Sequence, residues 1–110
     1  MNNNSKEYFK SCLSKATIAL LYFDNVYAEP VFIGFQPKDE YFEKDTWMFI
    51  PNGNVGVTVA FTDEDIMNAD ISYNEEKESF DIQFHNQSEL ADDGYENFNK
   101  IEFCYLKKAL

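Results

Sequence analysis

Residues 47–61 read Trp-Met-Phe-Ile-Pro-Asn-Gly-Asn-Val-Gly-Val-Thr-Val-Ala-Phe, and no other part of the chain predicts its own structure so clearly. The second half alternates apolar residues with small or polar ones, which is typical of a strand with one buried face. The pair Asn52-Gly53 separates this strand from a shorter apolar run and accepts the positive φ angles of a type I′ turn. We therefore expect a β-hairpin, and its core-facing side chains are Val55, Val57, Val59 and Phe61.

Further apolar runs on both sides of this hairpin also predict strands. Residues 17–23 are β-branched and aromatic and are apolar on both faces, which predicts a buried strand, with a continuation of the preceding helix as the alternative. Residues 26–36 contain alternating apolar residues, and Pro30 places the first half of that strand at a sheet edge. A second hairpin is predicted across the polar turn 74–78, and residues 100–106 predict the last strand.

Two helices are expected. Apolar residues recur at helical spacing after Ser5, which we take as the N-cap of the first helix. These apolar residues are Tyr8, Phe9, Cys12, Leu13 and Ala16. The stretch Thr62-Asp63-Glu64-Asp65 predicts an N-cap followed by the acidic first turn of a short helix over residues 63–68.

Together these elements predict an α+β, mainly β fold in a single domain, residues 1–110. We expect the N-terminal helix to pack on a curved antiparallel sheet of six or seven strands, or on a partly closed barrel. The sheet should be antiparallel because no stretch between strands is long enough for repeated helical crossovers. A chain of 110 residues can form its core without a metal or a disulfide.

The composition excludes several functions. The chain carries 20 Asp and Glu against 9 basic residues, all of them Lys, for a net charge of −11. Without arginine it can form no bidentate phosphate fork and no arginine–guanine contact. At this net charge nucleic acids and anionic membranes would repel it. A basic protein partner is favoured instead, because a field of one sign steers the opposite sign.

The sequence predicts a cytoplasmic protein. Its first residues lack a basic region followed by an apolar run, and its longest apolar stretch, residues 16–23, is too short to span a bilayer. In a reducing compartment Cys12 and Cys104 are expected to be free thiols, with a bridge between them as the alternative.

No catalytic site, metal site or cofactor is predicted. His85 is the only histidine, and it falls on the polar side of its strand without a defined partner. A zinc site would need His85, both cysteines and a carboxylate to converge from remote segments, and no ligand spacing supports that. The acids between Asp63 and Asp70 do not match the EF-hand pattern, which leaves an irregular calcium site as an alternative.

The placement of the acids indicates a binding surface. Residues 63–102 carry thirteen acids and two Lys, so this segment alone accounts for the net charge of −11. Acidity that only maintains solubility would be interspersed with basic residues. Acids beside aromatic rings suit a basic protein surface, because the acids steer the partner and the rings supply contact area. The candidate partner-binding residues are Asp63, Glu64, Asp65, Glu75, Glu76, Glu78, Asp92, Asp93, Tyr95 and Glu96.

With acids such as Asp63-Glu64-Asp65 and Asp92-Asp93, the chain resembles the small immunity proteins encoded beside bacterial nuclease toxins, including those of contact-dependent growth inhibition systems. The resemblance covers the chain as a class, through its size, its cytoplasmic character and its acidic face, and it rests on no motif. It implies a stoichiometric inhibitor that covers a basic nuclease site, with no enzymatic activity. Phage proteins that mimic DNA, such as some anti-CRISPR and anti-restriction proteins, look similar on the same grounds.

Two other functions are compatible with the sequence. The chain could be an accessory or scaffold domain whose acidity only maintains solubility. It could also be a small-ligand-binding β-barrel or a minor enzyme, which a cavity lined by Phe and Tyr would favour.

Overall fold

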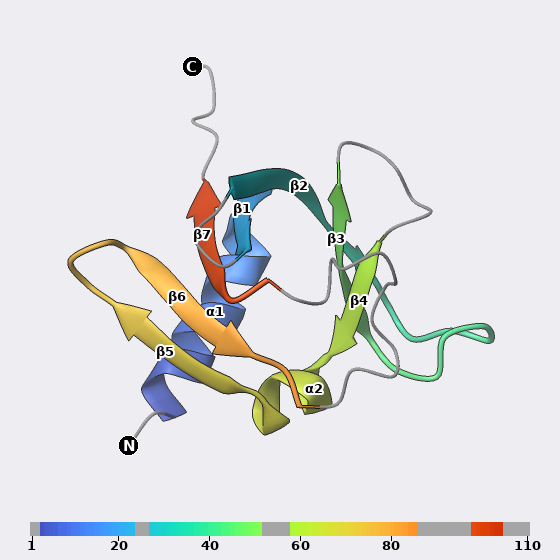
Figure 1. Ribbon diagram of the computed structural model, residues 1–110. Coiled ribbons are helices and arrows are strands. Elements are labelled where there is room, and N and C mark those ends of the chain that lie inside the picture. The colour runs from blue at the N-terminus through green and yellow to red at the C-terminus, as the bar shows by residue number, and fades with distance from the viewer. Residues whose placement is uncertain (1–2, 24–26, 52–57, 86–97, 105–110) are drawn as a thin grey trace, which may run out of the picture.

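In the computed structural model, seven strands form one antiparallel sheet that curls into a half-barrel (Figure 1). The structure describes residues 3–23, 27–51, 58–85 and 98–104. The strands are β1 (Ile18–Phe23), β2 (Tyr27–Gln36), β3 (Thr46–Pro51), β4 (Val59–Thr62), β5 (Asp70–Asn74), β6 (Ser79–Gln83) and β7 (Lys100–Cys104). The helices are α1 (Asn3–Lys15) and α2 (Asp63–Asn68). The strand order across the sheet is β4-β3-β2-β1-β7-β6-β5, which confirms the predicted fold class.

Helix α1 packs on the concave side of the sheet. Its side chains Phe9, Cys12 and Leu13 are buried in the core, whereas Tyr8 on the neighbouring position is partly exposed. The predicted apolar stripe is therefore confirmed for these three buried residues, whereas Ala16 is buried just beyond the end of the helix. The helix begins at Asn3, so Ser5 lies within it and the prediction of Ser5 as N-cap is wrong. Within the described part of the chain, neither helix is long and apolar enough to cross a membrane.

Strand β1 lies at the centre of the sheet, between β2 and β7. Ala19, Leu21 and Phe23 are buried on its inner side, and the residues between them are partly exposed on its outer side. Residues 18–23 thus form the predicted strand and do not continue α1. Strand β2 also forms as expected, and its described pairing with β3 runs from Val31 to Gln36, so Pro30 lies beyond that pairing.

The hairpin of β3 and β4 is confirmed, but its register differs from the predicted one. A two-residue turn at Asn52-Gly53 with continuous pairing would place Phe49 opposite Gly56. Phe49 instead pairs with Val59, three residues further along. This register brings the rings of Phe49 and Phe61 within 5.0 Å of each other in the core. Val59 and Phe61 are buried as predicted, whereas Val55 and Val57 lie outside the described residues.

Helix α2 begins as its sequence predicts. Thr62 is the N-cap, its hydroxyl accepts a hydrogen bond from the backbone N–H of Asp65, and the carboxylate of Asp65 accepts one from the backbone N–H of Thr62. This reciprocal capping box satisfies two backbone donors that would otherwise have no helical partner. The helix connects β4 to β5 and places Ile66 in the core.

Burial of Phe49 should contribute strongly to stability. Phe49 has no exposed surface, whereas Phe32 on the neighbouring strand is 54% exposed. We expect Phe49→Ala to lower the free energy of unfolding by about 3–5 kcal/mol. Phe32→Ala should lower it by less than about 1 kcal/mol, because little apolar surface returns to water. Urea unfolding followed by circular dichroism measures both, and equal effects would contradict the assignment of the two faces.

Candidate functional site

The three acids of α2 are engaged within the fold. The carboxylate of Asp63 lies 3.3 Å from Lys10 Nζ and accepts a longer hydrogen bond, 3.4 Å, from Trp47 Nε1. Glu64 forms an exposed ion pair with Lys44. Hydrogen bonding and the charge of the partner lower the pKa of Glu64 and raise that of Lys44. Asp65 is 5% exposed and caps the helix, so it is not available to a partner.

The acids of the β5–β6 turn are placed differently. Glu75, Glu76 and Glu78 are exposed, and none of them forms an ion pair with another residue that the structure describes. Asn74 Oδ1 accepts a hydrogen bond of 3.0 Å from the backbone N–H of Lys77, which stabilises the turn locally. Glu78 has a φ of 52°, in the left-handed region that side chains other than glycine seldom adopt.

The structure does not bring together into one cluster those predicted acids that it describes. Helix α2 precedes β5 and the acidic turn follows it, so the two groups lie at opposite ends of this strand (Figure 1). A five-residue strand spans roughly 17 Å. The remaining candidates lie outside the described residues, and they are Asp92, Asp93, Tyr95 and Glu96.

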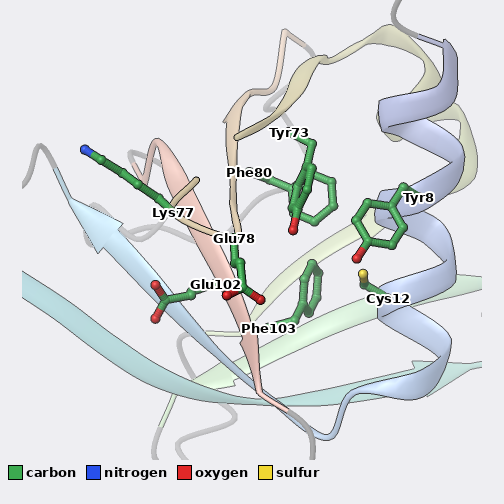
Figure 2. Close-up of a pocket in the computed structure, with 8 residues that line it drawn as sticks. All are labelled: Tyr8, Cys12, Tyr73, Lys77, Glu78, Phe80, Glu102 and Phe103. Atoms are coloured by element: carbon green, nitrogen blue, oxygen red, sulfur yellow. The ribbon is translucent and has the colours of Figure 1, made fainter. Parts of the chain in front are cut away.

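Beside the acidic turn a pocket opens between α1, β7 and the β5–β6 hairpin (Figure 2). Its volume is about 320 Å³, and it is lined by Tyr8, Cys12, Tyr73, Lys77, Glu78, Phe80, Glu102 and Phe103. The pocket forms because β6 pairs with β7 only at Phe80 with Ile101 and Asp81 with Lys100. Phe103 lies beyond the last of these pairs, where the hairpin diverges from β7.

Aromatic rings form the wall of this pocket. The rings of Tyr8 and Tyr73 meet edge to face with centroids 4.9 Å apart, and Tyr73 also contacts Phe80 at 4.9 Å. Figure 2 shows Tyr8 and Cys12 pointing from α1 toward these rings and toward Phe103. Burial, then the hydrogen bond to Tyr8, raises the pKa of Tyr73 above its ordinary value of 10.0. The Tyr73 phenol is therefore neutral at physiological pH.

Two carboxylates border the pocket. Glu78 comes from the turn, and Glu102 of β7 points to the other side of its strand (Figure 2). Glu102 accepts a hydrogen bond of 3.2 Å from the hydroxyl of Tyr22. Burial and this carboxylate raise the pKa of Tyr22. Aromatic walls with the Glu78 carboxylate at the border suit the apolar stem and charged head of a lysine or arginine side chain.

The sequence predicted only one residue of this pocket, Glu78. Tyr8 and Phe80 were expected in the core, because their spacing is that of an apolar stripe on a helix and on a strand. The pocket combines residues that are up to 95 positions apart, from Tyr8 to Phe103. One available signal was the pairing of two aromatic positions, Tyr73 and Phe80, across the predicted hairpin.

Possible catalytic groups are few in the described part of the chain. His85 Nε2 lies 2.7 Å from Asp70 Oδ2, and both side chains are exposed. Cys12 and Cys104 are free thiols, the first buried and the second partly exposed. No three His, Cys, Asp or Glu residues in the described ranges are placed to hold a metal ion. The absence of a catalytic role for His85 remains a prediction.

Comparisons with protein-family models, with curated proteins and with solved structures found no match to this chain. Function is therefore inferred from the geometry described above.

The acids of α2 should differ in their effect on stability. We expect Asp65→Ala to cost about 1–2 kcal/mol, because it removes one half of the capping box and leaves the Thr62 N–H without its acceptor. Glu64→Ala, the neighbouring acid in an exposed ion pair, should leave the unfolding midpoint unchanged within error. Thermal unfolding at pH 7 compares the two. Equal losses would show that Asp65 is not held in the capping box.

The raised pKa of Tyr73 in the pocket should be measurable in an alkaline titration. A raised pKa means that the fold favours the neutral Tyr73 phenol. This contribution to stability is present below the ordinary pKa of 10.0 and is lost as pH rises through the higher folded value. We expect Tyr8→Phe to lower the pKa of Tyr73 part of the way toward 10.0, because one hydrogen bond is removed. Phenolate absorbance as a function of pH measures the pKa of Tyr73, and the Tyr73→Phe variant identifies which part of the titration belongs to Tyr73. A titration that Tyr8→Phe leaves unchanged would contradict the hydrogen bond between Tyr8 and Tyr73.

Proposed function

We propose that the chain is a non-enzymatic acidic protein that binds a basic protein partner and neutralises it, and that the partner is a nuclease toxin. In this proposal the chain acts as an immunity protein, one molecule covering one toxin. The net charge of −11 supports it, because such a charge repels nucleic acid and attracts a protein whose own surface binds nucleic acid.

The observation that carries the proposal is the contrast between the two groups of acids. The fold uses the acids of α2 in a cap and in ion pairs. The acids of the β5–β6 turn have no such role among the described residues, although their like charges repel one another within one turn. They also stand beside an aromatic pocket, at Glu78. A basic partner would offset this repulsion.

One observation favours a second function. The pocket volume of about 320 Å³ is at the lower end of the range for small-ligand sites. A small cation could therefore occupy it without any protein partner. The two functions differ in the size of the contact. Binding of a small ligand would therefore be insensitive to charges outside the pocket, whereas binding of a protein partner would depend on them.

The proposed function can be tested by identifying the partner. We expect cross-linking in the cells that produce the chain, followed by mass spectrometry, to identify a protein rich in Lys and Arg. That protein, once purified, should cleave plasmid DNA or RNA, and an equimolar amount of this chain should stop the cleavage. An acidic or neutral partner, or a partner without nuclease activity, would contradict the proposal.

Two charge reversals then test the turn as a steering surface. Glu76→Lys should slow association with the purified partner by more than about twofold at low salt, because encounter depends on such charges. Glu40→Lys changes the net charge equally from an exposed loop and should have a smaller effect. Raising the ionic strength to about 0.5 M shortens the Debye length to roughly 4 Å and should abolish the difference. Equal effects of the two reversals would leave net charge alone as the cause.

A further inference from the structure

Most outward residues of strands β1 to β4 are apolar, and none of those that the structure describes is charged. Alternation along the strands directs every second side chain away from α1. The registers place these outward residues opposite one another: Phe32 with Ile18 and Ile50, and Met48 with Gly34 and Ala60. The apolar face, as we name it, consists of Ile18, Leu20, Ala28, Pro30, Phe32, Gly34, Met48, Ile50 and Ala60.

This face is accessible. Phe32 at its centre is 54% exposed, and no residue of the apolar face is buried. No described helix covers it, because α1 packs on the opposite side. An antiparallel sheet that turns one face to water normally carries polar residues there. Exposed apolar patches of several hundred Å² mark interaction sites in many soluble proteins.

The size of the apolar face limits what can bind. With strands spaced about 4.8 Å apart and about 3.3 Å per residue, four strands of five residues cover roughly 320 Å². A stable protein complex buries about 800 Å² on each partner. An occupant must therefore also cover the surroundings of the apolar face.

The surroundings on one side are acidic. The outer face of β7, β6 and β5 continues the same surface, and it presents Glu102, Asp81 and Asp70. Glu102 lies directly opposite Leu20 of the apolar face. Lys100 is the one base on the outward positions described for these three strands. An occupant that extends in this direction meets a net negative surface.

On the opposite side the apolar face leads into a hollow of about 650 Å³. Its floor is the outward face of β3 and β4, formed by Thr46, Ala60 and Thr62, and Ala60 pairs with Met48. Its walls include Tyr41, which is 84% exposed, and the ion pair of Lys44 with Glu64. Exposed ion pairs contribute little to stability, so an incoming arginine or lysine could replace Lys44 beside Glu64.

The curvature of the sheet favours a different protein over a second copy. The apolar face is the convex side of the half-barrel (Figure 1). Two convex faces would touch over a small area, and their acidic surroundings would repel each other. A convex surface fits a concave one, and enzyme active sites are concave.

We propose that the apolar face is the docking surface for a concave protein site with an apolar centre and basic residues at its margin. Phe32 is the central contact, and the hollow beside Glu64 receives a lysine or arginine side chain. This proposal rests on the proposed function, since it names the surface by which the basic partner is held. The turn acids act during encounter, and the apolar face determines how long the complex lasts.

The test uses a defined probe. The ¹⁵N-labelled chain is titrated with the peptide acetyl-Arg-Phe-Leu-Phe-Arg-amide and with the same peptide carrying Glu in place of Arg. We expect the basic peptide to shift amide signals of β1, β2 and β3, and the acidic peptide to bind at least about tenfold more weakly. Phe32→Ser should weaken the basic peptide about tenfold. Phe35→Ser, an exposed ring of the same strand on its inner side, should leave affinity unchanged.

Other outcomes overturn the proposal. Shifts confined to the β5–β6 turn and the pocket, or no shift at all, would exclude the apolar face as the site. A dimer of the wild-type chain in sedimentation that Phe32→Ser dissociates would assign the apolar face to a second copy. If the chain inhibits a purified basic nuclease and Phe32→Ser inhibits it equally well, the proposed function stands and this docking surface fails. If the peptide binds the apolar face and no basic partner exists, the docking surface stands and the proposed function fails.

Discussion

A seven-stranded sheet has two faces, and α1 is the one helix in the described part of the chain long enough to cover either of them. Its thirteen residues span roughly 20 Å. Phe9 and Leu13 fix it on one face, and the sheet curls around it. Because side chains alternate, every residue directed at the helix has neighbours directed away from it. Covering one face therefore leaves the other exposed, and the chain places apolar residues on both faces of β1, β2 and β3.

The elements that form within a few residues were predictable, and the geometry between them was not. The capping box of α2 lies within the four residues from Thr62 to Asp65, so its chemistry is visible in the sequence. The β5–β6 hairpin is equally local. The register of β3 with β4 depends instead on which rings meet in the core, as Phe49 and Phe61 do. Alternation alone leaves that choice open, because β3 carries apolar residues on both faces and either face can meet the apolar face of β4.

The candidate site shows the same limit. A count of acids located the segment with the charge, but it could not separate Asp65, which is buried in a cap, from Glu76, which is exposed at a turn. That difference depends on which side of α2 faces the core. The pocket requires β6 to diverge from β7 and α1 to cross the opening, so it combines contacts between remote segments. Neither the divergence of β6 from β7 nor the position of α1 over the opening is indicated by a local sequence pattern.

The outer face of the sheet keeps its charge and its exposed apolar surface largely apart. The apolar face carries no charge, the outward acids of the sheet stand on β5 to β7, and further exposed acids stand on the turn beyond them and at the hollow. Charges act over about 8–10 Å at physiological salt and attract any basic surface. Apolar contact acts only when shapes fit, and it governs dissociation more than encounter. A polycation of the wrong shape would therefore meet the acids and leave again, whereas a basic protein with a complementary concave site would remain. Selectivity then comes from the uncharged side chains around Phe32, although the acids dominate the composition.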